Sequence, residues 1–494
     1  MSLKTLMNKL LSILLFTSLI HAQSIHENQY MLKADPSRMK SIIFDTHTIL
    51  NKNNANLTKT VFGYLPYWEY YEGNHEFIRW DLLSHLAVFS FEVDSVGNLN
   101  FPELNEHSWP WNSIIDSAKN NNVKLIMTIA NFDPEVNGLL LSDEVIRQNL
   151  FSNIISTMKQ YDFDGVNIDF EYIDPLYTTN ILRDFLRLLR EELNKNSEDW
   201  ELSFATPIYG WGSWDFKAMT EYCDYLMIMG YDFYGKWANT TGPSAPLLGP
   251  YLSITDAIEQ EYKDVPKEKI ILGVPYYGNL WYTKSPLPYA DVIPYNDSLT
   301  FNYWQSILKY SQVINEIDNY QKLWDNSSQT SWLRKQLDDS TWSQIWFDDS
   351  TSLSLKYDLV LQKDLKGIGI WALGYDRERK ELWNLIKDKF TIPTSVDDKS
   401  TMPESFVLYQ NYPNPFNPET IINYSLPKAS HVKLKVYDIL GREVIQLLNE
   451  IKPQGNHKIV FSTSNINVTL SSGVYFYKLT TGNNSQIKKM VLLR

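Results

Sequence analysis

Eight short, strand-like runs recur along residues 59–390 of this chain, and helical patterns separate several of them. The runs are the segments 60–68, 83–93, 123–132, 163–171, 200–208, 225–233, 269–278 and 367–376. In the intervening segments 144–161 and 179–195, apolar residues recur every three or four positions, which is the period of an amphipathic helix. Eight strands, most of them followed by a helix, is the count of a (β/α)₈ barrel. The sequence therefore predicts the α/β fold class with a TIM barrel at residues 59–390.

A doubly wound open sheet is the alternative fold, because it also alternates strands with helices. That fold typically places a glycine-rich, phosphate-binding turn after its first strand. No such turn follows the run at 60–68. The barrel is therefore favoured over the open sheet.

The seventh and eighth runs are separated by residues 279–366, which is far too long for a bare loop. This segment holds a helical pattern at 303–317 and several aromatic residues. We expect a small subdomain, inserted after the seventh strand at about residues 282–345.

The residue composition and the strand pattern of the sequence both change near its C-terminal end. Residues 391–404 are rich in Pro, Ser, Thr and Asp, which is typical of a linker. Residues 405–494 contain short alternating strands with turn signals between them. That pattern predicts a small antiparallel β-sandwich.

The first residues have the pattern of a secretion signal. Lys4 and Lys9 precede a short apolar run at 10–20, and the small residue Ala22 follows. This order predicts a cleaved signal peptide at 1–23, and the run is too short for a comfortable membrane span. The polar, Asn-rich residues 24–58 are interpreted as an N-terminal linker or arm.

The composition of the chain limits the kinds of ligand and partner that we expect it to bind. The net charge of -13, with no basic cluster to neutralise phosphates, argues against nucleic acid. The single cysteine, Cys223, excludes an internal disulfide, and its position beside an apolar run predicts a buried small residue. The 16 Trp and 31 Tyr residues fit large cores, but flat rings also stack against the C–H faces of sugars.

The run at 162–171, DFDGVNIDFE, carries the most specific chemistry. Apolar and polar residues alternate, and successive side chains of a strand point to opposite faces. The apolar set should face the surrounding helices. The polar set should point into the barrel in a row about 7 Å apart; it comprises Asn167, Asp169 and Glu171.

Two carboxylates confined in one row cannot both ionise freely. Glu171 is nearest the C-terminal end of the strand, where barrel enzymes place their sites. A carboxylic acid kept protonated near neutral pH can protonate a glycosidic leaving group. A buried polar network or a metal site is the alternative interpretation. The scattered histidines, without ligand-type spacing, disfavour a metal.

Several motifs, in order along the barrel, resemble glycoside hydrolase family 18, the chitinases and their relatives. FDGVNIDFE resembles the family signature D-G-x-[D/N]-x-D-x-E. The other matching segments are GYLPYW at 63–68, MGYDFYGKW at 229–237, ILGVPYYGNLW at 271–281 and GIGIWALGYD at 367–376. The resemblance implies substrate-assisted catalysis, in which no second protein carboxylate is needed as nucleophile.

The resemblance implies a role for each matched residue. Glu171 would be the general acid and later the base. Asp169 would hold the N–H of the substrate's acetamido group, and Tyr231 would donate to its carbonyl. The implied substrate-binding residues are Trp371 as the floor beneath the distorted sugar, Asp232 and Met229 in the same subsite, Tyr64 and Tyr277 as walls, Trp237 in a neighbouring subsite, and Asn167.

Two features depart from the common chitinase pattern. Asn167 stands where Asp is common, so it cannot share a proton with Asp169 as a carboxylic acid would. The third run, with TIANF at 128–132, lacks the usual Ser-x-Gly-Gly turn, which predicts a different subsite shape. The segment VNIDFEYID also resembles the branch that trims spore cortex and peptidoglycan.

The tail resembles the C-terminal sorting domain of the type IX secretion system. The matching segments are YQNYPNPFNPETIINYSLP, YDILGREV, SSGVYFYKL and the terminal KKMVLLR, within residues 405–494. The resemblance implies a Gram-negative host of the Bacteroidota kind and a secreted or cell-surface location. A carbohydrate-binding sandwich is the alternative, which the few Trp and Tyr residues outside the motif disfavour.

Together these patterns predict a secreted glycosidase that cleaves β-1,4-linked N-acetylglucosamine polymers, chitin or chito-oligosaccharides, by retaining, substrate-assisted catalysis. Peptidoglycan glycan strands and N-glycans are alternative substrates, and a non-hydrolytic chitin-binding lectin is the alternative class. The expected partners are the polysaccharide and the type IX secretion machinery. We expect a monomer with no metal or cofactor.

Overall fold

The computed structural model describes residues 56–101, 111–249, 252–293, 306–392, 406–411, 414–463, 470–482 and 484–493. The chain divides into two compact units, Met1–Ile392 and Pro393–Arg494. The predicted signal peptide at 1–23, most of the arm at 24–58 and most of the linker at 391–404 lie outside the described residues.

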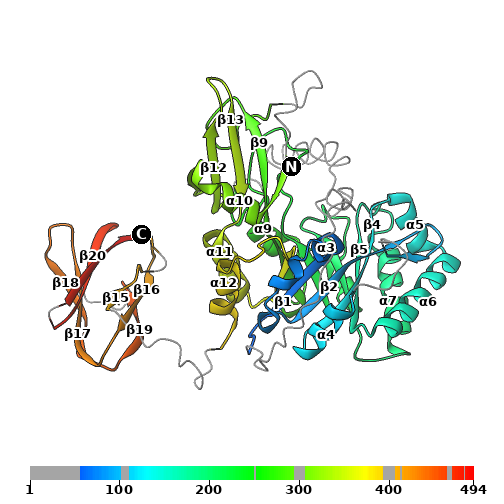
Figure 1. Cartoon of the computed structure of the whole chain (residues 1–494), viewed down its shortest axis with the longest axis horizontal. Coiled ribbons are helices and arrows are strands. Elements are labelled where there is room, and N and C mark those ends of the chain that lie inside the picture. The colour runs from blue at the N-terminus through cyan, green and yellow to red at the C-terminus, as the bar shows by residue number, and fades with distance from the viewer. Residues whose placement is uncertain are drawn as a thin grey trace, which may run out of the picture. The chain divides into compact units, whose positions relative to one another are not determined.

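Eight parallel strands form a closed barrel in the first unit (Figure 1). They are β1 (Thr60–Pro66), β2 (His85–Val93), β4 (Lys124–Asn131), β5 (Gly165–Phe170), β6 (Glu201–Pro207), β7 (Tyr225–Met229), β8 (Ile270–Pro275) and β14 (Gly367–Trp371). Their order is β1-β14-β8-β7-β6-β5-β4-β2, and a β1–β2 pairing closes the ring. The short β3 (Leu99–Asn100) pairs antiparallel with β2. Each strand falls within one of the eight predicted runs, so the predicted TIM barrel is confirmed.

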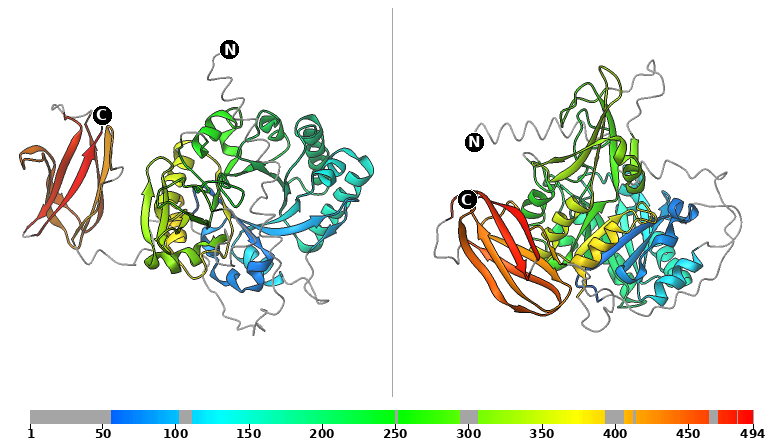
Figure 2. Two further views of the ribbon diagram at one scale, coloured as in Figure 1. Left: turned by 90° about the horizontal axis from the view of Figure 1, so that it is seen from above. Right: turned by 60° about the vertical axis from the view of Figure 1, so that its left-hand side comes forward.

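Helices surround the strands, as Figure 2 shows. They include α3 (Tyr67–Tyr71), α4 (Asn112–Asn120), α5 (Pro134–Ser142), α6 (Glu144–Tyr161), α7 (Asn180–Asn194), α8 (Phe216–Met219), α9 (Ile254–Gln260), α11 (Ser350–Gln362) and α12 (Glu381–Phe390). The helical patterns at 144–161 and 179–195 correspond to α6 and α7. The carboxylate of Asp143 caps α6 by accepting from the Val145 and Ile146 amides. Phe170 of β5 packs against Phe185 of α7, with ring centroids 6.0 Å apart.

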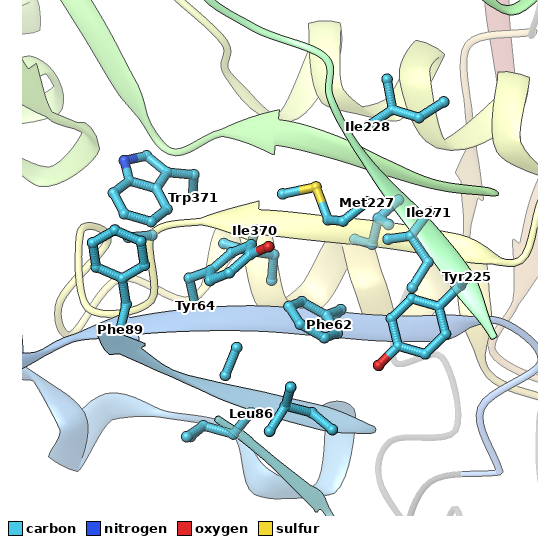
Figure 3. Close-up of a cluster of buried hydrophobic side chains, with 14 of the residues drawn as sticks. Phe62, Tyr64, Leu86, Phe89, Tyr225, Met227, Ile228, Ile271, Ile370 and Trp371 are labelled. Atoms are coloured by element: carbon cyan, nitrogen blue, oxygen red, sulfur yellow. The ribbon is translucent and has the colours of Figure 1, made fainter. Parts of the chain in front are cut away.

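Large side chains fill the inside of the barrel, as the close-up in Figure 3 shows. Phe62 of β1 and Tyr225 of β7 meet across it, with ring centroids 6.0 Å apart. Small residues make room for these large ones. A Cβ at Gly273 of β8 would lie 3.0 Å from the Met227 sulfur and from Cε1 of Tyr231. Glycine at this position therefore lets the side chain of Tyr231 enter the barrel.

Within the described residues, the inserted subdomain after β8 is a five-stranded antiparallel sheet with one α-helix. Its elements are β9 (Tyr277–Thr283), β10 (Ser306–Lys309), α10 (Tyr310–Glu316), β11 (Gln321–Asp325), β12 (Thr330–Gln336) and β13 (Trp342–Phe347). The sheet order is β10-β9-β13-β12-β11. The strands β9, β12 and β13 extend away from the barrel (Figure 1). Three buried tryptophans form its own core, and Trp332 stacks on Trp346 at 5.2 Å.

The helix predicted at 303–317 is only partly correct. Residues Tyr310–Glu316 are helical, but Ser306–Lys309 form β10. This strand pairs with β9, Ser306 opposite Leu280 and Lys309 opposite Tyr277. Pairing with a distant strand outweighs the local helical pattern.

The second unit is an antiparallel β-sandwich, as predicted. One sheet holds β15 (Val407–Leu408), β16 (Glu419–Leu426) and β19 (Gly455–Ser462); the other holds β18 (Glu443–Lys452), β17 (Ser430–Tyr437), β20 (Gly473–Thr481) and β21 (Asn484–Leu492). Tyr424 of the first sheet shares one buried core with Leu434 and Tyr477 of the second.

The prediction that Cys223 is a buried small residue can be compared directly with the structure. Cys223 is buried, and burial raises the pKa of its thiol to about 12. Among the helices of the described residues, none combines the length and apolarity needed to cross a bilayer.

Candidate active site

The polar row on β5 lies inside the barrel. Asn167 and Asp169 are fully buried, and Glu171 is 7% exposed. Tyr64 of β1 donates its hydroxyl to Oδ1 of Asn167 at 2.9 Å. Asn167 donates Nδ2 to the Ser203 hydroxyl of β6, also at 2.9 Å. The alternation of the strand therefore places the row where the sequence predicted.

Glu171 directly follows β5, and its main chain is fixed on both sides. Its amide donates to the Asn131 carbonyl at 3.0 Å, and its carbonyl accepts from Nδ2 of Asn137 at 2.6 Å. Asn137 is fully buried on α5. These two bonds fix the point from which the Glu171 side chain leaves the barrel wall. Sequence reasoning missed Asn137, because a lone Asn in an apolar helix carries no signal.

The segment after β7 supplies a second group of side chains. Met229, the last residue of β7, is half-buried, and Tyr231 is 3% exposed. The ring of Tyr231 meets that of Tyr277 edge-on, with centroids 6.2 Å apart. Asp232 has a left-handed backbone, with φ of 62°. A non-glycine residue in that conformation is strained, and such residues cluster at functional sites.

A ring of three hydrogen bonds links Asp232, Ser244 and Tyr277. Tyr277 donates its hydroxyl to Oδ1 of Asp232 at 2.5 Å, and Ser244 donates to the same phenol oxygen at 3.0 Å. The Asp232 amide donates to the Ser244 hydroxyl at 3.2 Å. Ser244 was not predicted, since it lies in a loop without a motif. The set fixes the orientation of the Asp232 carboxylate.

The residues after β7 are coupled electrostatically to the polar row of β5. Burial raises the pKa of Tyr231 far above its usual value, and the charges of Tyr64, Asp169, Asp232 and Glu171 raise it further. Burial likewise raises the pKa of Tyr64, with further contributions from Asp169 and Glu171. Both phenols are therefore neutral hydrogen-bond donors across the physiological pH range.

Trp371 ends β14 and is fully buried. Its ring centroid lies 5.5 Å from that of Tyr64 and 4.7 Å from that of Phe89 on β2. Figure 3 shows the three rings together at one end of the cluster. Phe89 was not predicted as part of this group. Trp237 is half-buried in the loop after Asp232, and none of the contacts above includes it.

The side chains gathered in this site can transfer a proton and form hydrogen bonds to an uncharged ligand. Across the described residues, no group of three or more His, Cys, Asp or Glu side chains could hold a metal ion. Two buried carboxyl groups lie with two neutral phenols and a tryptophan at the C-terminal end of a (β/α)₈ barrel, where the active sites of this fold are found.

The carboxyl row and the barrel that holds it both lie within the part of the chain that matches a known family of glycosidases. Residues 60–376 match glycosyl hydrolases family 18, and the chain belongs to that family. Residues 410–493 match the secretion system C-terminal sorting domain, so the sandwich is a sorting domain of the type IX system and indicates secretion.

Three relatives illustrate the range of similarity. The cortical fragment-lytic enzyme of Bacillus subtilis is 26% identical over 63% of this chain and 68% of its own length. Probable chitinase 2 of Drosophila melanogaster is 26% identical over 48% of this chain and 52% of its own. The solved structure of a variant Cycas revoluta GH18 chitinase with (GlcNAc)₄ has a TM-score of 0.57 and 21% identity, covering 67% and 99% of the two chains. At that identity the structure supports the fold alone.

Proposed function

We propose that this protein is a secreted glycoside hydrolase that cleaves β-1,4-linked N-acetylglucosamine polymers, chitin or chito-oligosaccharides. The observation that carries the proposal is the joint burial of Asp169, Glu171 and Tyr231, where the two carboxyl groups help to raise the pKa of Tyr231. An acid, a second carboxylate and a neutral donor are the groups that an acetamido sugar requires for substrate-assisted cleavage.

In the proposed mechanism Glu171 protonates the glycosidic oxygen as the bond to the anomeric carbon breaks. The carbonyl oxygen of the sugar's own acetamido group attacks that carbon from the opposite face and forms an oxazolinium-like intermediate. Asp169 accepts the acetamido N–H and stabilises the positive charge, while the neutral Tyr231 donates to the acetamido oxygen. Glu171 then takes a proton from water, which opens the intermediate with net retention of configuration.

The remaining residues would shape the subsite. Trp371 would be the floor beneath the distorted sugar, and Tyr64 and Tyr277 would flank it. Asp232 and Met229 would line the same subsite, Asn167 would support Asp169 from below, and Trp237 would serve a neighbouring subsite. All of these except Trp237 belong to the groups described above.

Peptidoglycan is the second candidate substrate. The similarity to a cortical fragment-lytic enzyme favours it, as the similarity to a chitinase favours chitin, and the two identities are equal at 26%. A chitin-binding lectin is a third candidate. The retained Glu171, Asp169 and Tyr231 favour an enzyme over a lectin.

The sorting domain supports a location outside the cell. We propose that the type IX machinery of a Gram-negative bacterium exports the protein and releases it or holds it at the cell surface. The expected working form is a monomer that meets its polysaccharide outside the cell.

The test is hydrolysis by the purified protein of labelled chito-oligosaccharides beside purified peptidoglycan. We expect cleavage of (GlcNAc)₄ to (GlcNAc)₆, with the new reducing ends first formed as the β anomer in proton NMR. A thiazoline mimic of the oxazolinium should inhibit, because it resembles the intermediate. Cleavage of peptidoglycan alone would transfer the proposal to that substrate, and an initial α anomer would contradict the retaining mechanism.

A further inference from the structure

The loop that follows β6, residues 208–215, carries an exposed indole. Trp211 is 40% exposed, and it is the only exposed tryptophan among the residues that the structure describes. The loop leaves the C-terminal end of β6, which lies between β5 and β7 in the barrel. Trp211 therefore belongs to the face of the barrel on which Glu171 and Tyr231 lie.

The exposed ring is held in place. It stacks on Tyr209, with centroids 5.3 Å apart and ring planes 26° apart. The Tyr209 hydroxyl donates to the Ser253 carbonyl at 2.9 Å and accepts from the Ser253 amide at 3.0 Å. The amide of Gly210 donates to Glu261 at 3.1 Å. Trp211 itself has a left-handed backbone, with φ of 51°. The exposed ring is thus held on a strained backbone and is fixed by the hydrogen-bonded Tyr209. A ring fixed in this way loses little freedom when it binds a ligand.

The ring is also connected to the active site. The Tyr209 ring meets Phe233 edge-on, with centroids 6.0 Å apart. Phe233 directly follows Asp232, and its amide donates to the carbonyl of Ser244 at 3.0 Å. Trp211, Tyr209 and Phe233 thus form a continuous row of three rings, here termed the aromatic ledge. It leads from solvent to the segment that carries Asp232.

We propose that the aromatic ledge is an additional sugar-binding subsite, at which Trp211 stacks against a pyranose ring of the same polymer. The proposal rests on the proposed function. A β-1,4-linked glucosamine unit holds its substituents equatorial, so both faces of its ring present C–H groups that pack against an indole. The subsite binds a unit remote from the bond that is cleaved, so it favours long chains over short ones.

The experiment compares Trp211→Ala with the wild-type full chain on (GlcNAc)₃ and (GlcNAc)₆. The ratio of kcat/KM for the hexamer to that for the trimer is expected to fall about tenfold, since the stacking contact is lost only with the longer chain. Trp211→Phe keeps a flat ring and should recover most of the ratio. Trp211→Leu keeps apolar volume without a flat face, so it should behave like the alanine variant and replaces it if that variant does not fold.

Leu361 provides a matched control. It is 37% exposed in the last turn of α11, which leads into β14 and so lies at the N-terminal ends of the strands. Leu361→Ala should leave the ratio unchanged. A fall in kcat/KM that is equal for both oligomers, or no fall in Trp211→Ala, would overturn the subsite. If the wild type cleaves neither oligomer, the proposed function itself is contradicted, which distinguishes the two failures.

Discussion

Tyr277 donates its hydroxyl to Oδ1 of Asp232 across 2.5 Å, and this bond joins the first strand of the inserted subdomain to the segment after β7. The Asp232 carboxylate after β7 is thus oriented by a residue that follows it by 45 positions. In the proposed site, β9 of the inserted subdomain would therefore supply one wall.

Tyr277→Phe tests this relationship. The variant leaves Asp232 and Ser244 without their shared partner while it preserves the ring and its packing. We expect kcat/KM on chito-oligosaccharides to fall about tenfold or more, because a hydrogen bond to a charged group contributes about 2 kcal/mol. The neighbouring Tyr276→Phe is the control, since that hydroxyl faces Tyr357 of α11. If Tyr276→Phe lowered kcat/KM as much as Tyr277→Phe does, the bond from Tyr277 to Asp232 would have no special role in the site.

A buried ion pair fixes the inserted subdomain to the barrel. Lys309 lies opposite Tyr277 in the β10–β9 register, and its Nζ lies 2.5 Å from Oε1 of Glu69, which is fully buried. Lys309→Met leaves the Glu69 carboxylate without this cation. We expect the free energy of unfolding to fall by about 3 kcal/mol, measured in urea.

The control for that experiment is Lys363→Met. Lys363 pairs with Glu259, and both side chains are more than a third exposed, so the expected loss is below about 1 kcal/mol. Lys309→Met should also lower kcat/KM, because the strand paired with Tyr277 is loosened. A loss of stability no greater than that of Lys363→Met would show that the buried pair does not hold the subdomain.

Glu201 makes the stability of the barrel depend on acid pH. Burial alone would raise the pKa of this carboxyl, but the bonds and charges of His85 and Lys124 outweigh burial and lower the pKa to about 2 from 4.5. A depressed carboxyl pKa stabilises the fold above the unfolded value, and the contribution is lost as pH falls from 4.5 to about 2. A shift of this size corresponds to about 3 kcal/mol while Glu201 is ionised and both His85 and Lys124 are charged.

Glu201→Gln should therefore be less stable than wild type at about pH 6, by urea unfolding. The difference between the two proteins should shrink progressively below pH 4.5, the usual pKa of this carboxyl. A difference that stays constant over that range would contradict the lowered pKa of Glu201.

Sequence reasoning succeeded for those parts of the molecule that depend on local periodicity. The eight barrel strands follow from short strand-like runs with helical patterns between several of them. The inward row on β5 follows from the alternation of apolar and polar residues along that one strand. The local pattern at Ser306–Lys309 predicts helix instead of the observed strand, because the pairing with β9 is long-range and leaves no local signal.

The same reason explains the residues that sequence reasoning missed. The missed residues come from one helix, one loop and one strand: Asn137, Ser244 and Phe89. Each of them is an ordinary residue within its own segment. The aromatic ledge at Trp211 stands out only through its exposure, a property that a sequence pattern does not give.

The central claim is that Glu171 transfers the proton while the substrate's own acetamido group acts as the nucleophile. Glu171→Gln tests it most directly, because the amide keeps the shape of the side chain and cannot protonate the leaving group. We predict that kcat on (GlcNAc)₆ falls about a thousandfold or more. The dissociation constant for a non-hydrolysable thio-linked analogue of the same oligomer, measured calorimetrically, should stay within about threefold of the wild-type value. Hydrolysis by Glu171→Gln at a substantial fraction of the wild-type rate would contradict the account.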